Sequence, residues 1–282
     1  MKSQNQAPEW AIAAGSVPGA SHLAAGGVGC QDANWIERLR NGWVLGILAD
    51  GAGSYSQSGL GAQFAVSTSA KYAKQLIYRK NWHKRTRLPH DLTWRKQATF
   101  LLRQIRSDLR AFAEDHNVGL EELSCTIIVM IATPFGAMLA HIGDGRAAVK
   151  TANEGWIAAM RPFNGLRHET VFITSPWEEN PMRFLRTNVI HHPIKGFMLC
   201  SDGGASASFR IAAASEYGGE IFDPNQPYAP FLDPICQQLL GLRGQRKSQS
   251  MINTLWKGFL KNGNDALAYE PDDKTIIIGA LS

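Results

Sequence analysis

The amino-acid sequence predicts an α+β fold in which antiparallel sheets have helices packed outside them. Strand-like and helix-like stretches come in blocks along the chain, which argues against a doubly wound parallel sheet. The chain has 282 residues, of which 44% are hydrophobic and 19% charged. Such a chain can bury a sizeable core and is not expected to be disordered. We expect residues 1–282 to form one domain.

The first half of the chain contains short strands and two long helices. Residues 10–36 are expected to be short strand and loop, and WVLGILAD at 43–50 is an apolar strand up to its last residue. Apolar residues spaced three and four apart predict helices at 58–80 and 93–115. The side chains expected to face the core are Leu60, Phe64, Ala65 and Tyr72 in the first helix, and Phe100, Leu101, Ile105, Leu109 and Phe112 in the second.

The second half contains most of the expected strands. These are placed at 124–132, 137–143, 146–150, 169–173, 195–200 and 274–280, with helices at 205–215 and 230–260. Residues 125–143 are long enough to cross a membrane, but the turn residues Thr133 to Gly136 favour two strands instead. Residues 153–188 are rich in Asn, Pro and Gly with weak periodicity, which predicts a flap insertion beside a functional site.

Asp-Gly follows an apolar run at three places: ILADGAGS (47–54), HIGDGRAA (141–148) and LCSDGGAS (199–206). Asp-Gly commonly makes a hairpin turn, but a second strand should then begin at once. The residues after Gly51 and Gly203 are small and polar instead. Carboxylates gathered at strand ends repel one another unless a cation lies between them, and Mg²⁺ and Mn²⁺ take oxygen ligands. Asp32, Asp272 and Asp273 also precede predicted strands.

Charge is unevenly distributed along the chain, whose net charge is +5. Residues 71–110 hold twelve Lys or Arg against Asp91 and Asp108, and the basic residues are densest at 79–87. A nucleic-acid site is one interpretation of this segment, and a solvated loop between two helices is the favoured one.

Cysteine usage and the N-terminal residues bear on localisation. Cys30, Cys125, Cys200 and Cys236 form no CxxC pair, which argues against a zinc site and favours reduced thiols. The first residues contain no long apolar stretch typical of a signal peptide. We therefore expect a cytoplasmic protein that is not bound to a membrane.

Six short motifs occur in a recognisable order: GCQD (29–32), ADGAGS (49–54), SCT (124–126), HIGDGR (141–146), CSDGG (200–204) and DDKT (272–275). Together with GASHLAAGGVGCQDA at 19–33, they resemble the metal-dependent protein phosphatases of type 2C, and more closely their bacterial branch. The resemblance spans residues 20–280. It implies a β-sandwich of two antiparallel sheets flanked by helices on both sides. It also implies hydrolysis of phosphoserine and phosphothreonine by a water activated by two or three Mn²⁺ or Mg²⁺ ions.

The resemblance assigns roles to single residues. Asp50 matches the acid that bridges two ions, the Gly51 carbonyl matches a ligand of one, and Asp202 and Asp272 match further ligands. Asp144 matches an acid that holds a third ion together with the Asp202 position. Asp32 matches an acid that holds a metal-bound water. The implied partner is a protein phosphorylated by a Ser/Thr kinase.

Two family features are missing. The phosphate-binding arginine a few residues before the Asp32 position is replaced by Gly26, Gly27 and Val28, and the histidine two residues after Asp50 is Ala52. His22 is a candidate for the missing acid, and Arg146, Arg161 and Arg167 are candidates for binding substrate. These absences leave open one alternative, a catalytically weak or inactive binding module of the same fold. The basic 79–87 segment leaves open a second, a nucleic-acid-binding protein.

Overall fold

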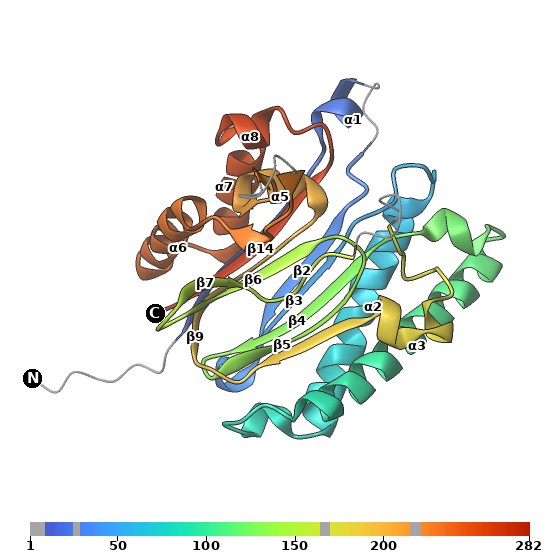
Figure 1. Ribbon diagram of the computed structural model, residues 1–282, viewed down its shortest axis with the longest axis horizontal. Helices are drawn as coiled ribbons and strands as arrows, with labels where there is room; N and C mark the ends of the chain where they lie inside the picture. Colours follow the sequence, from blue (N-terminus) through green and yellow to red (C-terminus); the bar gives the residue numbers. More distant parts are fainter. Residues whose placement is uncertain (1–8, 25–28, 164–169, 215–220) are drawn as a thin grey trace, which may run out of the picture.

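The computed structural model describes residues 9–24, 29–163, 170–214 and 221–282 of the chain. Its centre is a pair of five-stranded sheets in which all neighbouring strands run antiparallel. Helices cover the outer faces of the two sheets (Figure 1). This architecture confirms the predicted sandwich with helices on both sides.

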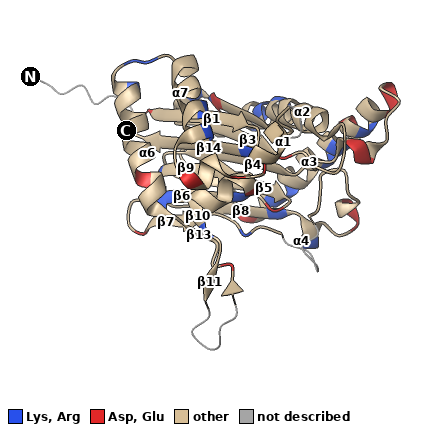
Figure 2. Ribbon diagram, turned by 90° about the horizontal axis from the view of Figure 1, so that it is seen from above, with Lys and Arg blue, Asp and Glu red and all other residues tan. Residues whose placement is uncertain are grey.

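The strand order is β1-β14-β9-β6-β7 in the first sheet and β2-β3-β4-β5-β8 in the second. The strands of the first sheet are β1 (Trp10–Val17), β6 (Arg146–Thr151), β7 (Gly155–Ala158), β9 (Ile194–Cys200) and β14 (Lys274–Leu281). Those of the second are β2 (Ala33–Arg38), β3 (Val44–Ala49), β4 (Ile127–Thr133), β5 (Gly136–Ile142) and β8 (Arg186–Ile190). Two short ribbons pair β10 (Phe209–Arg210) with β13 (Gln226–Pro227) and β11 (Ala213–Ala214) with β12 (Ile221–Phe222). The ribbon that contains β11 projects from the body of the molecule (Figure 2).

The helices form two outer layers. The long helices α2 (Ser58–Arg79) and α3 (Asp91–Asp115) pack on the second sheet. The first sheet is covered by α5 (Ala205–Ser208), α6 (Ala229–Gly244), α7 (Gln249–Asn262) and α8 (Asp265–Ala268). The remaining short elements are α1 (Ala20–Ala24), α4 (Pro181–Phe184), η1 (Arg40–Gly42), η2 (Trp82–Lys84), η3 (Leu120–Leu123), η4 (Trp177–Glu179) and η5 (Asp202–Gly204).

Strand β3 shows why the sequence lacks a polar face at 44–49. Leu45 and Ile47 pack toward α2 and α3, while Val44 and Leu48 pack in the layer between the two sheets. Both faces of the strand are therefore buried, so every position is apolar or small. Asp50 is the first polar residue after this strand, and its position marks the edge of the core.

The predicted core stripes of the two long helices are right except for one residue in each. Most of the predicted residues are buried or pack partly buried against the core: Phe64, Ala65, Tyr72, Leu101, Ile105, Leu109 and Phe112. Leu60 and Phe100 were placed wrongly, because their side chains are 40% and 68% exposed. The buried stripe of α2 consists largely of Ala, Ser and Gly, which give only a weak apolar pattern in the sequence.

Three predicted elements need correction. Residues 170–173 form no strand, and the fifth strand of the second sheet is β8 instead. The predicted helix at 205–215 ends at Ser208, where β10 begins. The predicted helix at 230–260 is two helices, because the chain turns at Arg246, whose φ is 55°.

The segment 153–188 differs from the predicted flap at both ends. It contributes β7 to the first sheet and the first residues of β8 to the second, and Trp177 between them is buried in the core. Residues 164–169 lie outside the described residues. Residues 125–143 form the β4–β5 pair, as predicted. Among the described helices, none combines the length and apolar character needed to cross a bilayer.

Candidate active site

The three Asp-Gly pairs lie where strands end. Asp50 follows β3, and Asp202 follows β9 after Ser201. Asp144 lies in the connection from β5 in the second sheet to β6 in the first, so this Asp-Gly passes between sheets and does not close a hairpin. The hairpin interpretation therefore fails at all three places. We refer to this end of the sandwich, with Asp32, Asp50, Asp144, Asp202 and Asp272, as the acidic rim.

Backbone hydrogen bonds hold Asp50 in place beyond the end of β3. Thr126 N–H donates to the Asp50 carbonyl at 2.8 Å, and Asp50 N–H donates to Thr126 Oγ1 at 3.1 Å. Ala52 N–H donates to the Ser124 carbonyl at 3.0 Å, which continues the pairing by one further step. The position of the Asp50 carboxylate is thus set by a strand-like backbone rather than by a loose turn.

Two glycines allow backbones to approach closely at the rim. A Cβ at Gly51 would lie 2.7 Å from the Gln31 carbonyl oxygen, and one at Gly203 would lie 2.3 Å from the Asp273 carbonyl oxygen. Both distances are too short for any side chain, so both positions require glycine. The approach of Gln31 to Gly51 brings the neighbouring Asp32 beside Asp50.

Asp32 is a buried carboxylate with one unused oxygen. Its side chain is 6% exposed, and its Oδ2 accepts a hydrogen bond from Ser201 Oγ at 2.9 Å. Its Oδ1 is buried and has no hydrogen-bond partner among the described residues. Burial raises the pKa of Asp32 to about 7, and the nearby charge of Asp273 adds to this. An unpaired buried carboxylate oxygen is costly unless a positive group or a donor faces it.

The other rim carboxylates crowd one another. Burial raises the pKa of Asp50 well above its ordinary value, and the charges of Asp32, Asp202 and Asp144 raise it further. Asp202 is exposed on one side, but partial desolvation of its carboxylate and the charges of Asp144 and Asp272 raise its pKa to about 6. Like charges held this close need a counter-charge to remain ionised at neutral pH.

The carboxylate oxygens at the rim are suitable ligands for a divalent cation. The unpartnered Asp32 Oδ1 and the negative charges that surround Asp50 both indicate missing positive charge. The described residues contain no cluster of three His, Cys, Asp or Glu side chains arranged as a complete ligand set. The rim carboxylates are hard oxygen ligands, the type that Mg²⁺ and Mn²⁺ take.

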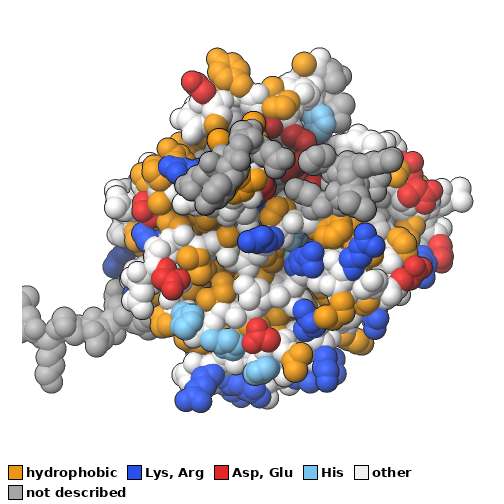
Figure 3. All heavy atoms as spheres, viewed as in Figure 1, with side chains coloured by type: hydrophobic (Ala, Val, Ile, Leu, Met, Phe, Trp, Pro, Cys, Tyr) orange, Lys and Arg blue, Asp and Glu red, His pale blue; other side chains and the backbone are white. Residues whose placement is uncertain are grey.

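Asp144 and Asp272 lie at the outer side of the rim. Asp144 Oδ2 accepts a hydrogen bond from Thr170 Oγ1 at 2.6 Å. Asp272 is exposed, and its Oδ1 accepts from Asp273 N–H at 2.7 Å. Acidic side chains gather in a hollow near the top of the face seen in Figure 3. Both acids act electrostatically on the rest of the rim: the charges of Asp144 and Asp272 raise the pKa of Asp202, and that of Asp144 also raises the pKa of Asp50.

Asp273 precedes a predicted strand, but the sequence assigned it no role at the site. Its side chain is 3% exposed, and it accepts hydrogen bonds from Gly19 N–H at 2.8 Å and Gln31 N–H at 2.6 Å. Its Oδ1 also lies 2.7 Å from His22 Nδ1. Asp273 thereby fixes the segments before and after residues 25–28 to the start of β14. Nothing in the Asp272–Asp273 doublet distinguishes the inward-facing residue from the outward-facing one.

The three arginines predicted to bind substrate have different surroundings. Arg146 is 7% exposed, and its guanidinium donates to Asp223 Oδ2 and to Asn225 Oδ1, each at 2.6 Å. This is a correction: Arg146 anchors the projecting ribbon and does not face the rim as an open cation. Arg161 is exposed, two residues before Phe163, whose N–H donates to the Gly143 carbonyl at 2.9 Å. Arg167 lies outside the described residues.

None of the four thiols has the surroundings of a nucleophile. All four cysteines are unpaired, as predicted, and three of them are buried. Burial raises the pKa of Cys125, Cys200 and Cys236 to about 12, and it also raises that of Cys30. The thiolate is the reactive form of cysteine, so the rim carboxylates are the better candidates for the chemistry.

The geometry can be compared with known proteins. A family model described as protein phosphatase 2C matches residues 18–255. The chain belongs to the protein phosphatase 2C family. The carboxylate rim and the two-sheet fold are both consistent with membership of this family. The chain is a metal-dependent serine/threonine protein phosphatase.

Relatives within the protein phosphatase 2C family cover nearly the whole chain. Serine/threonine-protein phosphatase 3 of Escherichia coli (strain K12) is 26% identical over 279 residues, which are 95% of this chain and 97% of the relative. The catalytic domain of the phosphatase PstP, solved with two manganese ions, has a TM-score of 0.54 at 15% identity and covers 96% of this chain and 98% of its own. Phosphatase Stp1 from Staphylococcus aureus has a TM-score of 0.53 at 14% identity and covers 96% of this chain and 94% of its own. These structural likenesses support the fold.

Proposed function

We propose that the acidic rim holds two or three Mn²⁺ or Mg²⁺ ions and hydrolyses phosphoserine and phosphothreonine in proteins phosphorylated by a Ser/Thr kinase. The observation that carries this proposal is the crowding of carboxylates around Asp50, whose pKa is raised by burial and by the charges of Asp32, Asp202 and Asp144, next to the unpartnered Asp32 Oδ1. When bound, such ions polarise phosphoryl oxygens and lower the pKa of water.

The rim residues divide this work. Asp50 and the Gly51 carbonyl, with Asp202 and Asp272, are the proposed ligands of two ions, and Asp144 with Asp202 is the proposed pair for a third. Asp32 Oδ1 has no other partner among the described residues, so it is available to accept a hydrogen bond from the attacking water and orient it. Ser201, which donates to Asp32 Oδ2, keeps the carboxylate turned in this direction.

His22 is the proposed donor of a proton to the departing serine or threonine oxygen. Its Nδ1 is held by Asp273, so Nε2 is the ring nitrogen left for substrate. A carboxylate that fixes one ring nitrogen sets the tautomer and the orientation of the other. Asp273 would therefore act as a positioning residue for His22. Arg161, exposed beside the Gly143–Asp144 turn, is the proposed contact for the substrate phosphate.

Turnover with a small substrate tests this proposal directly. Purified protein should hydrolyse p-nitrophenyl phosphate and a phosphothreonine peptide when Mn²⁺ is present. EDTA should stop both reactions and excess Mn²⁺ should restore them. Absence of turnover above a buffer blank at millimolar Mn²⁺ would favour an inactive binding module of the same fold.

We also propose a cytoplasmic location, which the four unpaired cysteines support.

A further inference from the structure

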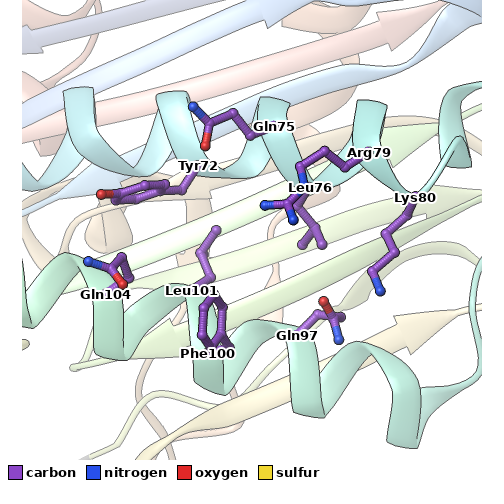
Figure 4. Close-up of a pocket in the computed structure, with 9 residues that line it drawn as sticks. All are labelled: Tyr72, Gln75, Leu76, Arg79, Lys80, Gln97, Phe100, Leu101 and Gln104. Atoms are coloured by element: carbon purple, nitrogen blue, oxygen red, sulfur yellow. The ribbon is translucent and has the colours of Figure 1, made fainter.

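A groove of about 560 Å³ lies between α2 and α3, on the helical layer that covers the second sheet. Its lining residues are Tyr72, Gln75, Leu76, Arg79 and Lys80 from α2, and Gln97, Phe100, Leu101 and Gln104 from α3. Leu76, Arg79 and Lys80 reach toward α3, while Leu101 and Gln97 reach toward α2 (Figure 4). None of these residues belongs to the acidic rim.

The groove lies in a surface with unbalanced positive charge. Residues 71–110 hold twelve Lys or Arg, and in the described part of the chain only Lys74 and Arg106 of these form ion pairs. Asp108, at one end of the groove, already accepts hydrogen bonds from Tyr72 Oη at 2.6 Å and Gln104 Nε2 at 3.0 Å. Many of the blue segments in Figure 2 lie along α2 and α3. The cations Arg79 and Lys80 therefore face a groove with no carboxylate to neutralise them in the described structure.

The same groove offers apolar and amide contacts. Phe100 is 68% exposed although it is large and aromatic, and Leu76 and Leu101 line the groove beside it. Gln75 and Gln97 make no side-chain hydrogen bond within the described residues, so their amides can pair with the backbone of an extended peptide. The aliphatic side chain of Leu76 offers a nucleic acid neither charge nor a stacking surface, whereas an apolar side chain of a peptide packs on it, so a peptide fits the whole groove better.

The groove and the acidic rim are joined by α2. The helix begins at Ser58, whose carbonyl carbon would lie 3.0 Å from a Cβ at Gly51. With a rise of 1.5 Å per residue, the groove spans about 20–30 Å from that end of the helix. An extended chain of roughly ten residues covers this distance. One partner protein can therefore occupy both places at once.

We propose that the α2–α3 groove docks an acidic, extended segment of the phosphoprotein substrate, with one apolar side chain of that segment packed on Phe100. The proposal rests on the phosphatase activity proposed above. Charge complementarity would steer the substrate to this face. Tethering would raise the effective concentration of the phosphorylated residue at the rim, which lowers KM and leaves kcat unchanged.

A binding measurement tests the docking without using activity. The probe is a fluorescein-labelled decapeptide of Glu and Asp with one central Trp, followed by fluorescence anisotropy at low ionic strength. The double variant Arg79→Glu/Lys80→Glu should weaken binding about tenfold or more, and Phe100→Ser should weaken it by a smaller factor. The matched control is Lys257→Glu/Lys261→Glu on α7, which makes the same change in net charge on the opposite helical layer. Absence of binding, or equal loss in the control, overturns the proposal.

A kinetic measurement separates docking from catalysis. A phosphothreonine peptide is compared with the same peptide joined to the acidic decapeptide by a ten-residue Gly-Ser linker. The joined peptide should show a KM lower by about tenfold, and Arg79→Glu/Lys80→Glu should remove the difference. Equal KM values with normal turnover of p-nitrophenyl phosphate refute docking alone, whereas lack of all turnover refutes the proposed activity. Displacement of the decapeptide by single-stranded DNA at lower concentration than by unlabelled peptide would identify a nucleic-acid site instead.

Discussion

The acidic rim and the α2–α3 face both collect charges of one sign, but they do so in different surroundings. The rim holds Asp32 in a buried position and Asp50 in a half-buried one at strand ends, and both pKa values are raised. The α2–α3 face holds Arg79, Lys80 and Arg103 on exposed helix surface. Like charges in water are screened and cost little, while like charges taken out of water cost much.

Because the two regions differ in exposure to water, they are suited to different functions. A cluster of carboxylates partly withdrawn from water is stable in its charged form only when a cation neutralises it, so the rim needs a bound metal ion. An exposed basic face is stable without a partner, so it can bind and release one. The effects of substitutions in the rim can therefore be compared with those of substitutions on the α2–α3 face.

The largest effect is expected from Asp50→Asn at the rim. The substitution keeps the shape but removes the proposed bridging charge, so Mn²⁺-dependent hydrolysis of p-nitrophenyl phosphate should fall by about 10³-fold or more. In EDTA the same variant should melt at a higher temperature than the wild type, because one member of a repelling buried cluster is gone. Circular dichroism confirms folding. A wild-type rate would refute the role of Asp50.

His22→Ala is expected to discriminate between substrates. A serine alkoxide needs protonation as it leaves, whereas p-nitrophenolate is a good leaving group. The rate on a phosphoserine peptide should therefore fall by roughly 10²–10⁴-fold, and that on p-nitrophenyl phosphate by much less. Asp273→Asn is the companion variant and should reproduce part of the loss by releasing the imidazole. Equal losses on both substrates would instead assign His22 to phosphate binding or structure.

The stability of the metal-free protein should depend on pH through the rim. The folded-state pKa values of Asp32, at about 7, and Asp202, at about 6, lie above the unfolded value near 3.8. The folded state therefore binds more protons than the unfolded state between about pH 4 and 7, so stability falls as pH rises through this window. In EDTA, the melting temperature should drop by on the order of 5–10 °C from pH 5 to pH 8. Mn²⁺ should remove most of this slope. A melting temperature that rises across the same window would contradict the assigned shifts.

The smallest effect is expected on the basic face. Arg103→Glu reverses an exposed charge amid an excess of cations and touches no residue of the rim. Stability should change by at most about 0.5 kcal/mol, and in the stabilising direction. Turnover of p-nitrophenyl phosphate should match the wild type. A loss of several degrees in melting temperature would show that this face has a structural role that its exposure does not reveal.

The sequence located the acids near the ends of strands but not the contacts of the loops around them. Asp50, Asp144 and Asp202 could be found from the sequence because an acid at the end of an apolar run is a local pattern. The partners of Arg146 were not, because Asp223 and Asn225 lie 77 and 79 residues further along the chain. Asp273 was noticed but its inward orientation depends on Gly19 and Gln31, which no local pattern links to it.

Local sequence patterns were likewise insufficient to predict every buried residue of the two long helices. The presence and length of α2 and α3 followed from apolar spacing, and most of the residues of their buried stripes were right. The alanine-rich stripe of α2 gave little signal, so Leu60 was assigned to the core although it is 40% exposed. The exposed Phe100 was likewise assigned to the core, and its position in a groove could be recognised only once both helices were placed.

Anomalous diffraction from Mn²⁺-soaked crystals can locate the metal that the rim carboxylates are proposed to bind. We predict anomalous peaks within about 2.0–2.4 Å of oxygens from Asp50, the Gly51 carbonyl and Asp202, and loss of these peaks in crystals of Asp50→Asn. Peaks confined to other parts of the surface, or peaks at the rim that remain unchanged in Asp50→Asn, would contradict the account.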